Sequence, residues 1–354
     1  MSSYRILLHI RASGGGGAER VFATLANGFV RRGHAVTLAV DELVDADKLD
    51  PRVDLVDLGR NHVKGVLKLA RLIRRGRYDI LAAGVAVSNV KLTLAKLLAP
   101  STAPLVLSYH GFREYRTGKL SAAAYYGMPL LRLIAARFIC VSNGLMRALI
   151  EEWHAPADRT IRIYNPVPLP AHHVNAEEVN ARPPVIGAVG RLSAEKGMDV
   201  LVSALRLMRT PDVRLLIGGE GPERDKLEKL IAELGLQDRV TLAGQVDGPG
   251  AIYDKVRVAA VPSRTEAFGM TAVEALAHGL PVVASDCDGP AEILGDGRFG
   301  LVVPVDDPVS LASGLDLMLS RPHDPALGIW RAGQFSDEIG LDQWEAAFEA
   351  VIRR

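Results

Sequence analysis

The stretch Pro262–Asp286, PSRTEAFGMTAVEALAHGLPVVASD, is the most informative segment of this chain. It follows an apolar run and opens with a polar turn that contains Glu266. Helix formers surround Glu274, and Gly279 and Pro281 mark the end of that helix before a second apolar run begins. The pattern predicts strand, loop, helix and strand. In open α/β sheets the loops at the carboxyl ends of the strands hold the ligand, so Glu266 is placed to contact one.

The composition is that of a soluble globular protein with two domains. The chain has 354 residues, of which 48% are apolar and 23% are charged. The two cysteines, Cys140 and Cys287, lie far apart and form no CxxC pair, which is typical of the reducing cytosol. The segment MSSYRILLHI lacks the long apolar core of a signal peptide, and charges interrupt the apolar region Leu81–Ala99. We therefore expect a cytoplasmic protein.

The net charge of +1 hides two halves of opposite sign. Residues 1–165 contain 24 Lys and Arg against 13 Asp and Glu, whereas residues 166–354 contain 18 against 28. A basic half joined to an acidic half is expected where one domain meets an anionic surface or substrate. Solvent-exposed surfaces whose charge has no function would give the same numbers of acidic and basic residues, and the two explanations are about equally supported.

The first half alternates strand and helix patterns. The strand pattern Tyr4–Ile10 is followed by the glycine run Gly14–Gly17 and then by a helical pattern. Such a turn brings backbone N–H groups and a helix amino terminus towards an anion, although a flexible loop without a ligand has the same composition. The strand pattern APLVLSYH ends at His110 beside a glycine, which makes His110 a site candidate. A lone histidine more often has a structural role.

The segment Lys64–Arg77, KGVLKLARLIRRGR, combines apolar and basic residues without an acid. This composition fits a helix that lies on an anionic membrane surface. It also fits a helix packed on a sheet with its basic face in water, and that alternative is the better supported of the two.

Prolines mark the domain boundary. Asn165-Pro166, Pro168 and Pro170 form a stiff segment that is incompatible with a helix. We place the first domain at residues 1–167 and the second at residues 168–339, with a terminal amphipathic helix at about 340–354. Strand and helix patterns alternate again after the linker, so each half is predicted to be a doubly wound α/β domain with a parallel sheet.

Two cations follow the first strand pattern of the second half, in the loop G-R-L-S-A-E-K-G. Arg191 and Lys196 at the head of a helix would hold a phosphate or diphosphate. The loop that contains Glu266 should open on the same edge of the sheet. Loops that converge on one crevice favour a ligand site over an isolated salt-bridged loop.

The spacing of Glu266 and Glu274 excludes the paired carboxylates of a glycosidase. Eight helical residues rise about 12 Å, whereas catalytic carboxylate pairs lie roughly 5–9.5 Å apart. We interpret Glu266 as an acceptor for sugar hydroxyl groups and Glu274 as a separate anchor. The pairs Asp45-x-Asp47 and Asp286-x-Asp288 offer metal-binding spacings that often arise by chance, and no third ligand is evident. We expect neither a metal nor a cofactor.

On these residues the chain resembles the retaining glycosyltransferases of family 4, which have the GT-B fold. GGGGAER resembles the amino-terminal glycine-rich loop of the family, GRLSAEKG resembles its phosphate-binding loop, and EAFGMTAVE carries its E-x7-E signature. The E-x7-E block is highly specific in this setting, and the resemblance covers nearly the whole chain. It implies an α/β protein of two Rossmann-like doubly wound domains that face a central cleft, with the terminal helix crossing back onto the first domain.

The resemblance also implies a role for each matching residue. The catalytic set would be His110, near the transferred sugar, Glu266, on the sugar hydroxyls, and Arg191 and Lys196, which would neutralise the diphosphate leaving group. The remaining contacts concern donor binding: Gly16 and Gly17 would approach the diphosphate or the acceptor, the backbone of Phe268, Gly269 and Met270 would hold sugar and phosphate, and Glu274 would hold the ribose.

The implied reaction is the transfer of a sugar, with retention, from a UDP- or GDP-linked donor to a glycan or lipid-linked acceptor. It would serve cell-surface polysaccharide or glycolipid synthesis, with peripheral contact between the basic domain and the inner face of an anionic membrane. Positive charge on Arg191 and Lys196 would stabilise the leaving group without a metal. The alternatives are a nucleotide-sugar epimerase of the same architecture and a non-catalytic nucleotide-binding protein. No nucleic acid partner is expected.

Overall fold

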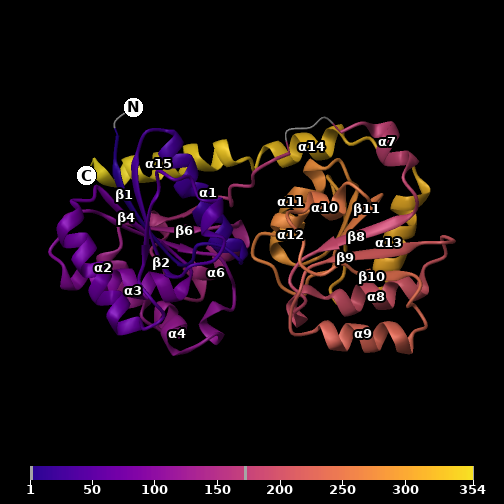
Figure 1. Ribbon diagram of the computed structural model, residues 1–354, viewed down its shortest axis with the longest axis horizontal. Helices are drawn as coiled ribbons and strands as arrows, with labels where there is room; N and C mark the ends of the chain where they lie inside the picture. Colours follow the sequence, from indigo (N-terminus) through magenta and orange to yellow (C-terminus); the bar gives the residue numbers. More distant parts are fainter. Residues whose placement is uncertain (1–2, 171–173, 354) are drawn as a thin grey trace. The chain divides into compact units, whose positions relative to one another are not determined.

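The computed structural model describes residues 3–170 and 174–353 and contains two parallel sheets (Figure 1). The chain divides into two compact units. Unit 1 comprises Met1–Pro168 and Ser336–Arg354, and unit 2 comprises Leu169–Phe335. Each unit is a doubly wound α/β structure, and the predicted fold class is confirmed.

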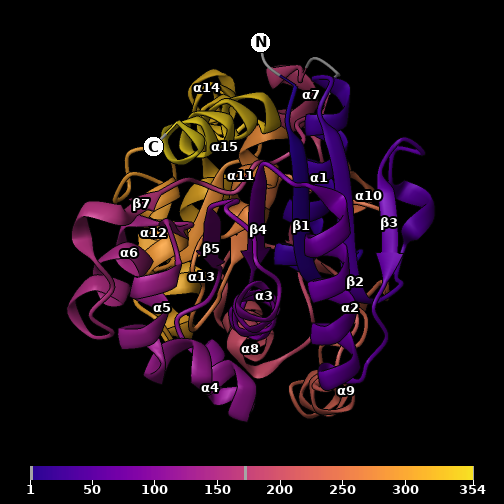
Figure 2. The same cartoon turned by 90° about the vertical axis from the view of Figure 1, so that its left-hand side faces the viewer.

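The sheet of unit 1 has seven parallel strands in the order β3-β2-β1-β4-β5-β6-β7 (Figure 2). The inner strands are buried on both faces, and their sequences are accordingly continuous apolar runs. The strands are β1 (Arg5–Ala12), β2 (Ala35–Glu42), β3 (Asp54–Asp57), β4 (Ile80–Gly84), β5 (Leu105–Tyr109), β6 (Arg137–Cys140) and β7 (Thr160–Arg162).

Helices cover both faces of this sheet. In Figure 1, α1 and α15 lie on one face, and α2, α3 and α4 lie on the other. The helical segments are α1 (Gly17–Arg31), α2 (His62–Gly76), α3 (Ala86–Leu98), α4 (Lys119–Tyr126), α5 (Met128–Ile134), α6 (Asn143–Glu151) and α15 (Asp337–Ile352), with the 3₁₀ turns η1 (Ala46–Lys48), η2 (Glu114–Arg116) and η3 (Ala157–Arg159). Across the described ranges 3–170 and 174–353, no helix has the length and apolarity needed to cross a bilayer.

Unit 2 repeats the plan with six parallel strands in the order β10-β9-β8-β11-β12-β13. Its strands are β8 (Val185–Val189), β9 (Arg214–Gly218), β10 (Val240–Leu242), β11 (Val258–Val261), β12 (Val282–Ser285) and β13 (Leu301–Val303). Its helices are α7 (Ala176–Ala181), α8 (Met198–Leu207), α9 (Arg224–Glu233), α10 (Gly250–Tyr253), α11 (Met270–Ala277), α12 (Asp288–Ile293), α13 (Pro308–Ser320) and α14 (Ala326–Gly333), with the 3₁₀ turn η4 (Ala194–Lys196).

The two strand orders share one topology. In each unit the first strand lies in the middle of the sheet, the next two strands lie on one side of it, and the chain then crosses to the other side. The order therefore reverses between β1 and β4 in unit 1 and between β8 and β11 in unit 2. In doubly wound sheets this reversal leaves a crevice at the carboxyl ends of the strands, where ligands bind.

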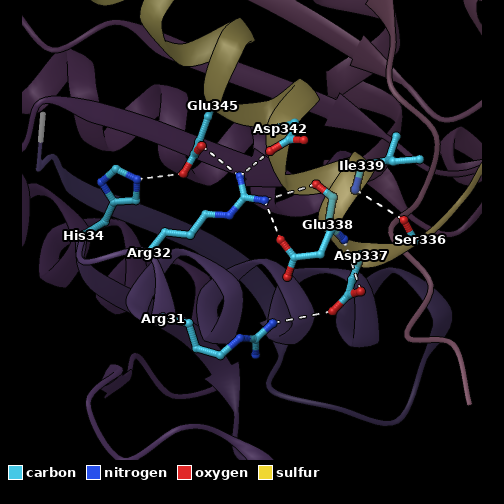
Figure 3. Close-up of polar contacts among 9 residues, drawn as sticks. All are labelled: Arg31, Arg32, His34, Ser336, Asp337, Glu338, Ile339, Asp342 and Glu345. Carbon is cyan, nitrogen blue, oxygen red and sulfur yellow. Dashed lines mark hydrogen bonds and ion pairs between the residues drawn. The ribbon is translucent and has the colours of Figure 1, made fainter. Parts of the chain in front are cut away.

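Helix α15 is built into unit 1 although it lies far away in the sequence. The guanidinium of Arg32 contacts three of its carboxylates, at 2.6 Å from Glu338, 2.7 Å from Asp342 and 2.8 Å from Glu345 (Figure 3). Trp344 of α15 is 2% exposed and packs edge-on against Phe22 of α1. Apolar packing and a cluster of charges thus fix α15 to α1.

Unit 1 also contains a buried ion pair. Lys91 of α3 is fully buried and pairs with Asp41 of β2. His9 of β1 is fully buried beside them and has Nδ1 at 2.9 Å from the Ala39 carbonyl oxygen. Burial lowers the pKa of His9 to about 4, against the weaker opposing effect of Asp41. The imidazole is therefore neutral at neutral pH.

Candidate active site

The predicted donor-binding residues of unit 2 lie where its strand order reverses. Strands β8 and β11 are neighbours, with Ala259 paired to Gly187. The loop after β8 contains Arg191 and Lys196, and the loop after β11 contains Glu266. Since both strands run in the same direction, the two loops leave the sheet at the same edge.

An ion pair joins these two loops. Lys196, at the end of η4, contacts the carboxylate of Glu266, and their side chains are 25% and 19% exposed. The cation and the anion predicted to bind different parts of a donor are therefore adjacent. Arg191 is exposed in the same loop as Lys196.

Tight backbone packing holds the two loops together. Gly197 follows Lys196 directly and has φ +63°, and a Cβ atom there would clash with the carbonyl oxygen of Pro262. Only glycine suits this combination of positive φ and close approach. The position of Lys196 is therefore set by the backbone of the Glu266 loop as well as by its own helix.

A further residue of the Glu266 loop, Arg264, connects the loops by side-chain contacts. Its guanidinium donates to both carboxylate oxygens of Asp199 (2.9 and 2.7 Å), to Asp306 (2.6 Å) and to the carbonyl oxygen of Ala194 in η4 (2.6 Å). Its backbone N–H donates to the carbonyl oxygen of Glu195 (2.8 Å). The hydrogen bonds to Asp199 are the largest cause of the raised pKa of Arg264. Arg264 was not among the predicted site residues.

Helix α11 begins directly after the Glu266 loop, at the same edge of the sheet. Gly269 precedes the helix with φ +91° and provides no side-chain cap. The first N–H groups of a helix have no partner within it, and this is the physical basis for the predicted anion contact at Phe268, Gly269 and Met270. Phe268 itself is 2% exposed and packs edge-on against Phe335, which anchors this turn.

Glu274 differs from Glu266 in its surroundings. It lies within α11, as predicted, and is only 3% exposed. Its negative charge is one cause of the raised pKa of the buried Tyr253, after burial itself. The two glutamates are therefore separate groups, one partly exposed in a loop and one buried in a helix.

In unit 1 the glycine-rich loop is less open to an anion than its sequence indicates. Helix α1 begins at Gly17 after the N-cap Gly16, which offers no side-chain cap. A Cβ atom at Gly16 would clash with the carboxylate of Glu19, a residue of the first turn that is 7% exposed. A carboxylate therefore already lies at this helix terminus, where it reduces the positive potential.

His110 lies directly after β5, at the predicted position. Its Nε2 atom is 2.8 Å from Ser108 Oγ, and its ring meets Phe22 edge-on. Burial lowers the pKa of His110 to about 4, and the side chain of Asn165 opposes this only in part. The imidazole is neutral at neutral pH and is able to exchange hydrogen bonds but carries no charge.

Glu114 is a second residue that the sequence did not single out. Its carboxylate accepts the backbone N–H groups of His110 (3.0 Å) and Ala86 (2.6 Å). Burial raises the pKa of Glu114 to about 7. No motif marks it, because its partners are backbone atoms of two separate loops.

The acidic pairs Asp45-x-Asp47 and Asp286-x-Asp288 lie at η1 and at the start of α12. Among the side chains that the structure describes, no group of three or more His, Cys, Asp or Glu is arranged to hold a metal ion.

Two family models match consecutive parts of the chain. Glycosyltransferase Family 4 matches residues 15–169, and Glycosyl transferases group 1 matches residues 172–327. Two relatives are similar over most of their length. The lipopolysaccharide core biosynthesis glycosyltransferase LpsE of Rhizobium meliloti is 26% identical over 95% of this chain and 96% of that protein.

The second relative is the N-acetylgalactosamine-N,N'-diacetylbacillosaminyl-diphospho-undecaprenol 4-alpha-N-acetylgalactosaminyltransferase of Campylobacter jejuni. It is 26% identical over 88% of this chain and 89% of that protein. Among solved structures, HepE of Anabaena in complex with UDP has a TM-score of 0.83 at 21% identity, covering 98% of this chain and 100% of that chain. This similarity shows the GT-B fold.

Proposed function

We propose a specific reaction for this chain, which belongs to family 4 of the glycosyltransferases and is an enzyme with the GT-B fold. It transfers a sugar from a nucleoside diphosphate donor to a glycan or lipid-linked acceptor, with retention of the anomeric configuration. The observation that carries the proposal is the ion pair of Lys196 and Glu266, which joins the loops after β8 and β11. It brings together a cation and a carboxylate, proposed to bind phosphate and sugar hydroxyl groups respectively, at the edge where doubly wound sheets bind ligands.

The donor contacts are proposed to divide between the two loops. Arg191 and Lys196 bind the diphosphate, and Glu266 accepts hydrogen bonds from sugar hydroxyl groups. The first N–H groups of α11, around Gly269, add partial positive charge at the phosphate. Glu274 is proposed to hold the ribose. Donor binding then places the phosphate beside Lys196 and the sugar beside its ion-pair partner.

The transition state explains why these groups would accelerate the reaction. Breaking the bond between the anomeric carbon and the phosphate oxygen leaves negative charge on the diphosphate and positive charge on the sugar. Arg191 and Lys196 stabilise the leaving group where its charge develops. The neutral imidazole of His110 is proposed to form a hydrogen bond near the transferred sugar, because its low pKa keeps it uncharged beside a cationic sugar.

The donor is proposed to be UDP- or GDP-linked. The structural relative HepE is described with UDP bound, which supports a nucleoside diphosphate leaving group. The acceptor proposal follows the named activities of the two sequence relatives, one in lipopolysaccharide core synthesis and one on a diphospho-undecaprenol carrier. We place the enzyme in cell-surface polysaccharide or glycolipid synthesis, on the cytoplasmic side of the membrane.

The experiment is a donor screen by thermal shift, followed by measurement of released nucleoside diphosphate and mass analysis of the product. A donor that binds only the folded protein raises its melting temperature. With the donor found, Lys196→Ala and Glu266→Ala should each lower kcat/KM by about 100-fold or more. Lys229→Ala, an exposed lysine of α9 in the same unit, is the matched control and should keep full activity.

Two results would contradict the assignment. Unchanged turnover in both site variants would remove the proposed roles of the ion pair. Conversion of the donor sugar without an acceptor would identify a nucleotide-sugar epimerase instead.

We also propose that transfer needs no divalent metal, since Arg191 and Lys196 supply positive charge to the leaving group. Turnover should then change less than about twofold when Mg²⁺ is replaced by a chelator. This limit is well below the fall in turnover expected when one contact to the leaving group is lost. A loss of activity that added Mg²⁺ restores would contradict this proposal.

Membrane contact is proposed for the α2 and α3 surface of unit 1. Helix α2 buries Leu69, Ala70 and Ile73, and its basic side chains are all exposed. The neighbouring helix α3 exposes Leu94, Leu97 and Leu98 at 44%, 57% and 53%. The exposed basic residues are Lys64, Lys68, Arg71, Arg74 and Arg75 of α2 and its C-cap residue Arg77. Basic side chains beside exposed leucines suit an anionic bilayer surface.

Vesicle co-sedimentation tests this contact. Binding should rise with the fraction of anionic lipid and fall with salt, and charge reversal at Arg71 and Arg74 should weaken it. Vesicle binding that depends on neither the fraction of anionic lipid nor the salt concentration would count against the proposal.

A further inference from the structure

We propose that Glu114 is a positioning residue, which fixes His110 and the turn at Val85–Ala86 by holding one backbone N–H group of each. The proposal rests on the glycosyltransferase reaction for its effect on turnover, but the contacts themselves are independent of that reaction. Nothing in the sequence motifs assigns a role to Glu114.

The two contacts connect adjacent strand ends. Strands β4 and β5 are paired, with Gly84 opposite Ser108, so the turn after β4 and His110 lie side by side. Glu114 begins η2, four residues after His110. One carboxylate oxygen accepts the N–H of Ala86 at 2.6 Å, and the other accepts the N–H of His110 at 3.0 Å. A single side chain thus links both loops.

The turn after β4 needs such support. Val85 has φ +64° and ψ 154°, a conformation that is unfavourable for a β-branched residue. It is also the N-cap of α3 and makes no side-chain cap contact. Glu114 binds the N–H of the next residue, Ala86, and so supplies from another loop the acceptor that the helix terminus lacks.

The surroundings of Glu114 explain its chemistry. The nearby Glu19 of α1 adds to the burial effect that raises the pKa of Glu114 to about 7, while the backbone N–H contacts oppose it. The hydroxyl of Tyr125 in α4 donates to the Gly111 carbonyl oxygen at 2.9 Å and fixes the same loop. The titratable groups that interact with the carboxylate or with the loop it holds are Glu19, Tyr109, His110 and Tyr125, and Arg113, Tyr115 and Arg116 are its neighbours in the sequence.

Protonation should therefore loosen the link. An ionised carboxylate has acceptor sites on both oxygens, whereas a protonated one turns one oxygen into a hydroxyl group. One of the two N–H groups then faces the hydroxyl oxygen, which is a weaker acceptor than a carboxylate oxygen. The link is complete when Glu114 is ionised and weaker when it is protonated, so its strength should rise with pH around neutrality.

Kinetics of Glu114→Gln test the proposal. Because the glutamine side chain can accept one N–H but presents its own N–H₂ to the other, kcat should fall about 10- to 100-fold. The donor KM should change less than about threefold, because its proposed contacts lie in other loops. The wild-type kcat should rise with pH through an apparent pKa near 7, and this rise should be absent in Glu114→Gln.

The conservative variant Glu114→Asp keeps the carboxylate and should recover part of the lost kcat. Glu152→Gln, at an exposed carboxylate that follows α6 in the same unit, is the matched control and should retain the wild-type pH profile. A Glu114→Gln enzyme with wild-type kcat and wild-type pH profile would overturn the proposal.

Amide hydrogen exchange gives a readout that needs no turnover. In the wild-type protein, protection of the Ala86 and His110 amides should fall as pH drops below about 7, after correction for intrinsic exchange. The Leu107 amide of β5 should not follow this change. Protection of Ala86 and His110 that does not depend on pH would overturn the proposal. If the wild-type enzyme transfers no sugar from any donor, the proposed function fails, and the exchange result alone decides on Glu114.

Discussion

At the carboxyl end of the first sheet, one carboxylate, Glu114, holds two backbone N–H groups beside the neutral imidazole of His110. At the corresponding end of the second sheet, ion pairs join Lys196 to Glu266 and Arg264 to Asp199. The second lies where the strand order of its sheet reverses, between β8 and β11, and the first lies beside the reversal of its sheet, at the ends of β4 and β5. The same topology therefore supports two different kinds of site.

This difference shows that the total charge of a half does not give the charge of its site. Residues 1–165 are strongly basic, but their strand ends carry Glu19, Glu114 and an uncharged histidine. Residues 166–354 are acidic, but their strand ends carry Arg191 and Lys196. The segment Lys64–Arg77 has six exposed basic residues and no acid, and so supplies about half of the basic excess of the first half. The net charge of a domain describes its outer surface, whereas the charge of the site depends on the residues in the loops that follow the strands.

The first way to break this comparison lies within unit 1, at the buried pair of Lys91 and Asp41. Replacement Lys91→Met leaves Asp41 buried without its cation, and should lower the free energy of unfolding by about 3–5 kcal/mol. Urea denaturation of the variant and of the exposed control Lys64→Met measures the effect. A loss below about 1 kcal/mol would show that the buried pair does not stabilise unit 1.

The second prediction tests the ion pairs of unit 2. Arg264→Ala removes the contacts to Asp199, Asp306 and the Ala194 carbonyl oxygen, and should destabilise unit 2 by about 2–3 kcal/mol and raise the donor KM. Arg264→Lys should recover little, because an ammonium group lacks the planar fork. Melting curves and donor KM values of the two variants test this, and equal behaviour of Arg264→Lys and wild type would contradict it.

The third prediction uses pH. The pKa of His9 is about 4 in the folded protein, against its ordinary value of 6.5, so the unfolded chain binds the proton first as pH falls. The stability contributed by neutral His9 is complete above pH 6.5 and is lost towards pH 4. Between about pH 7 and about pH 4.5 this loss should reach about 2 kcal/mol. Denaturation of wild type and His9→Gln at both pH values isolates it as the difference between their pH dependences.

The smallest effect is expected at the surface of unit 2. Arg224 of α9 pairs with Glu220 at 2.6 Å and Glu228 at 2.9 Å, distances similar to those around Arg264. Since both pairs join residues four apart in the sequence, Arg224→Ala should change the free energy of unfolding by less than about 0.5 kcal/mol. The Arg264 pairs are about equally exposed, so the comparison with Arg264→Ala, measured in the same buffer, separates contacts between loops and to a backbone carbonyl oxygen from local pairs.

Sequence patterns were sufficient for the inner part of each sheet. Long apolar strands and the glycine-rich loops predicted the doubly wound fold, and the structure confirms it. The edge strands β3 (DLVD) and β7 (TIR) were missed, because each is short and only partly buried. Helices α4 and α5 were also missed. Pairing with a neighbouring strand, rather than local periodicity, creates such edge strands.

The candidate site was predictable only where residues act as members of a motif. Lys196 and Glu266 follow recognisable patterns, and the structure brings them together. Arg264 and Glu114 carry no such mark. The partners of Glu114 are backbone N–H groups of two loops, and Arg264 contacts Asp199, Asp306 and a carbonyl oxygen that are brought to it only by folding. Contacts to backbone atoms depend on how loops meet after folding, and a single sequence does not encode them as a pattern. The catalytic roles remain predictions.

The docking of α15 onto α1 also sets an order of events during synthesis. Unit 1 is made from two pieces of chain, and unit 2 lies between them in the sequence. Trp344 and Phe348 leave the ribosome only after all of unit 2 has been translated. Until then, Phe22 and Phe29 lack their aromatic partners on α15, and Arg32 lacks its carboxylates. Unit 2 is therefore able to fold first, and the amino-terminal unit matures last, in reverse of the usual vectorial order.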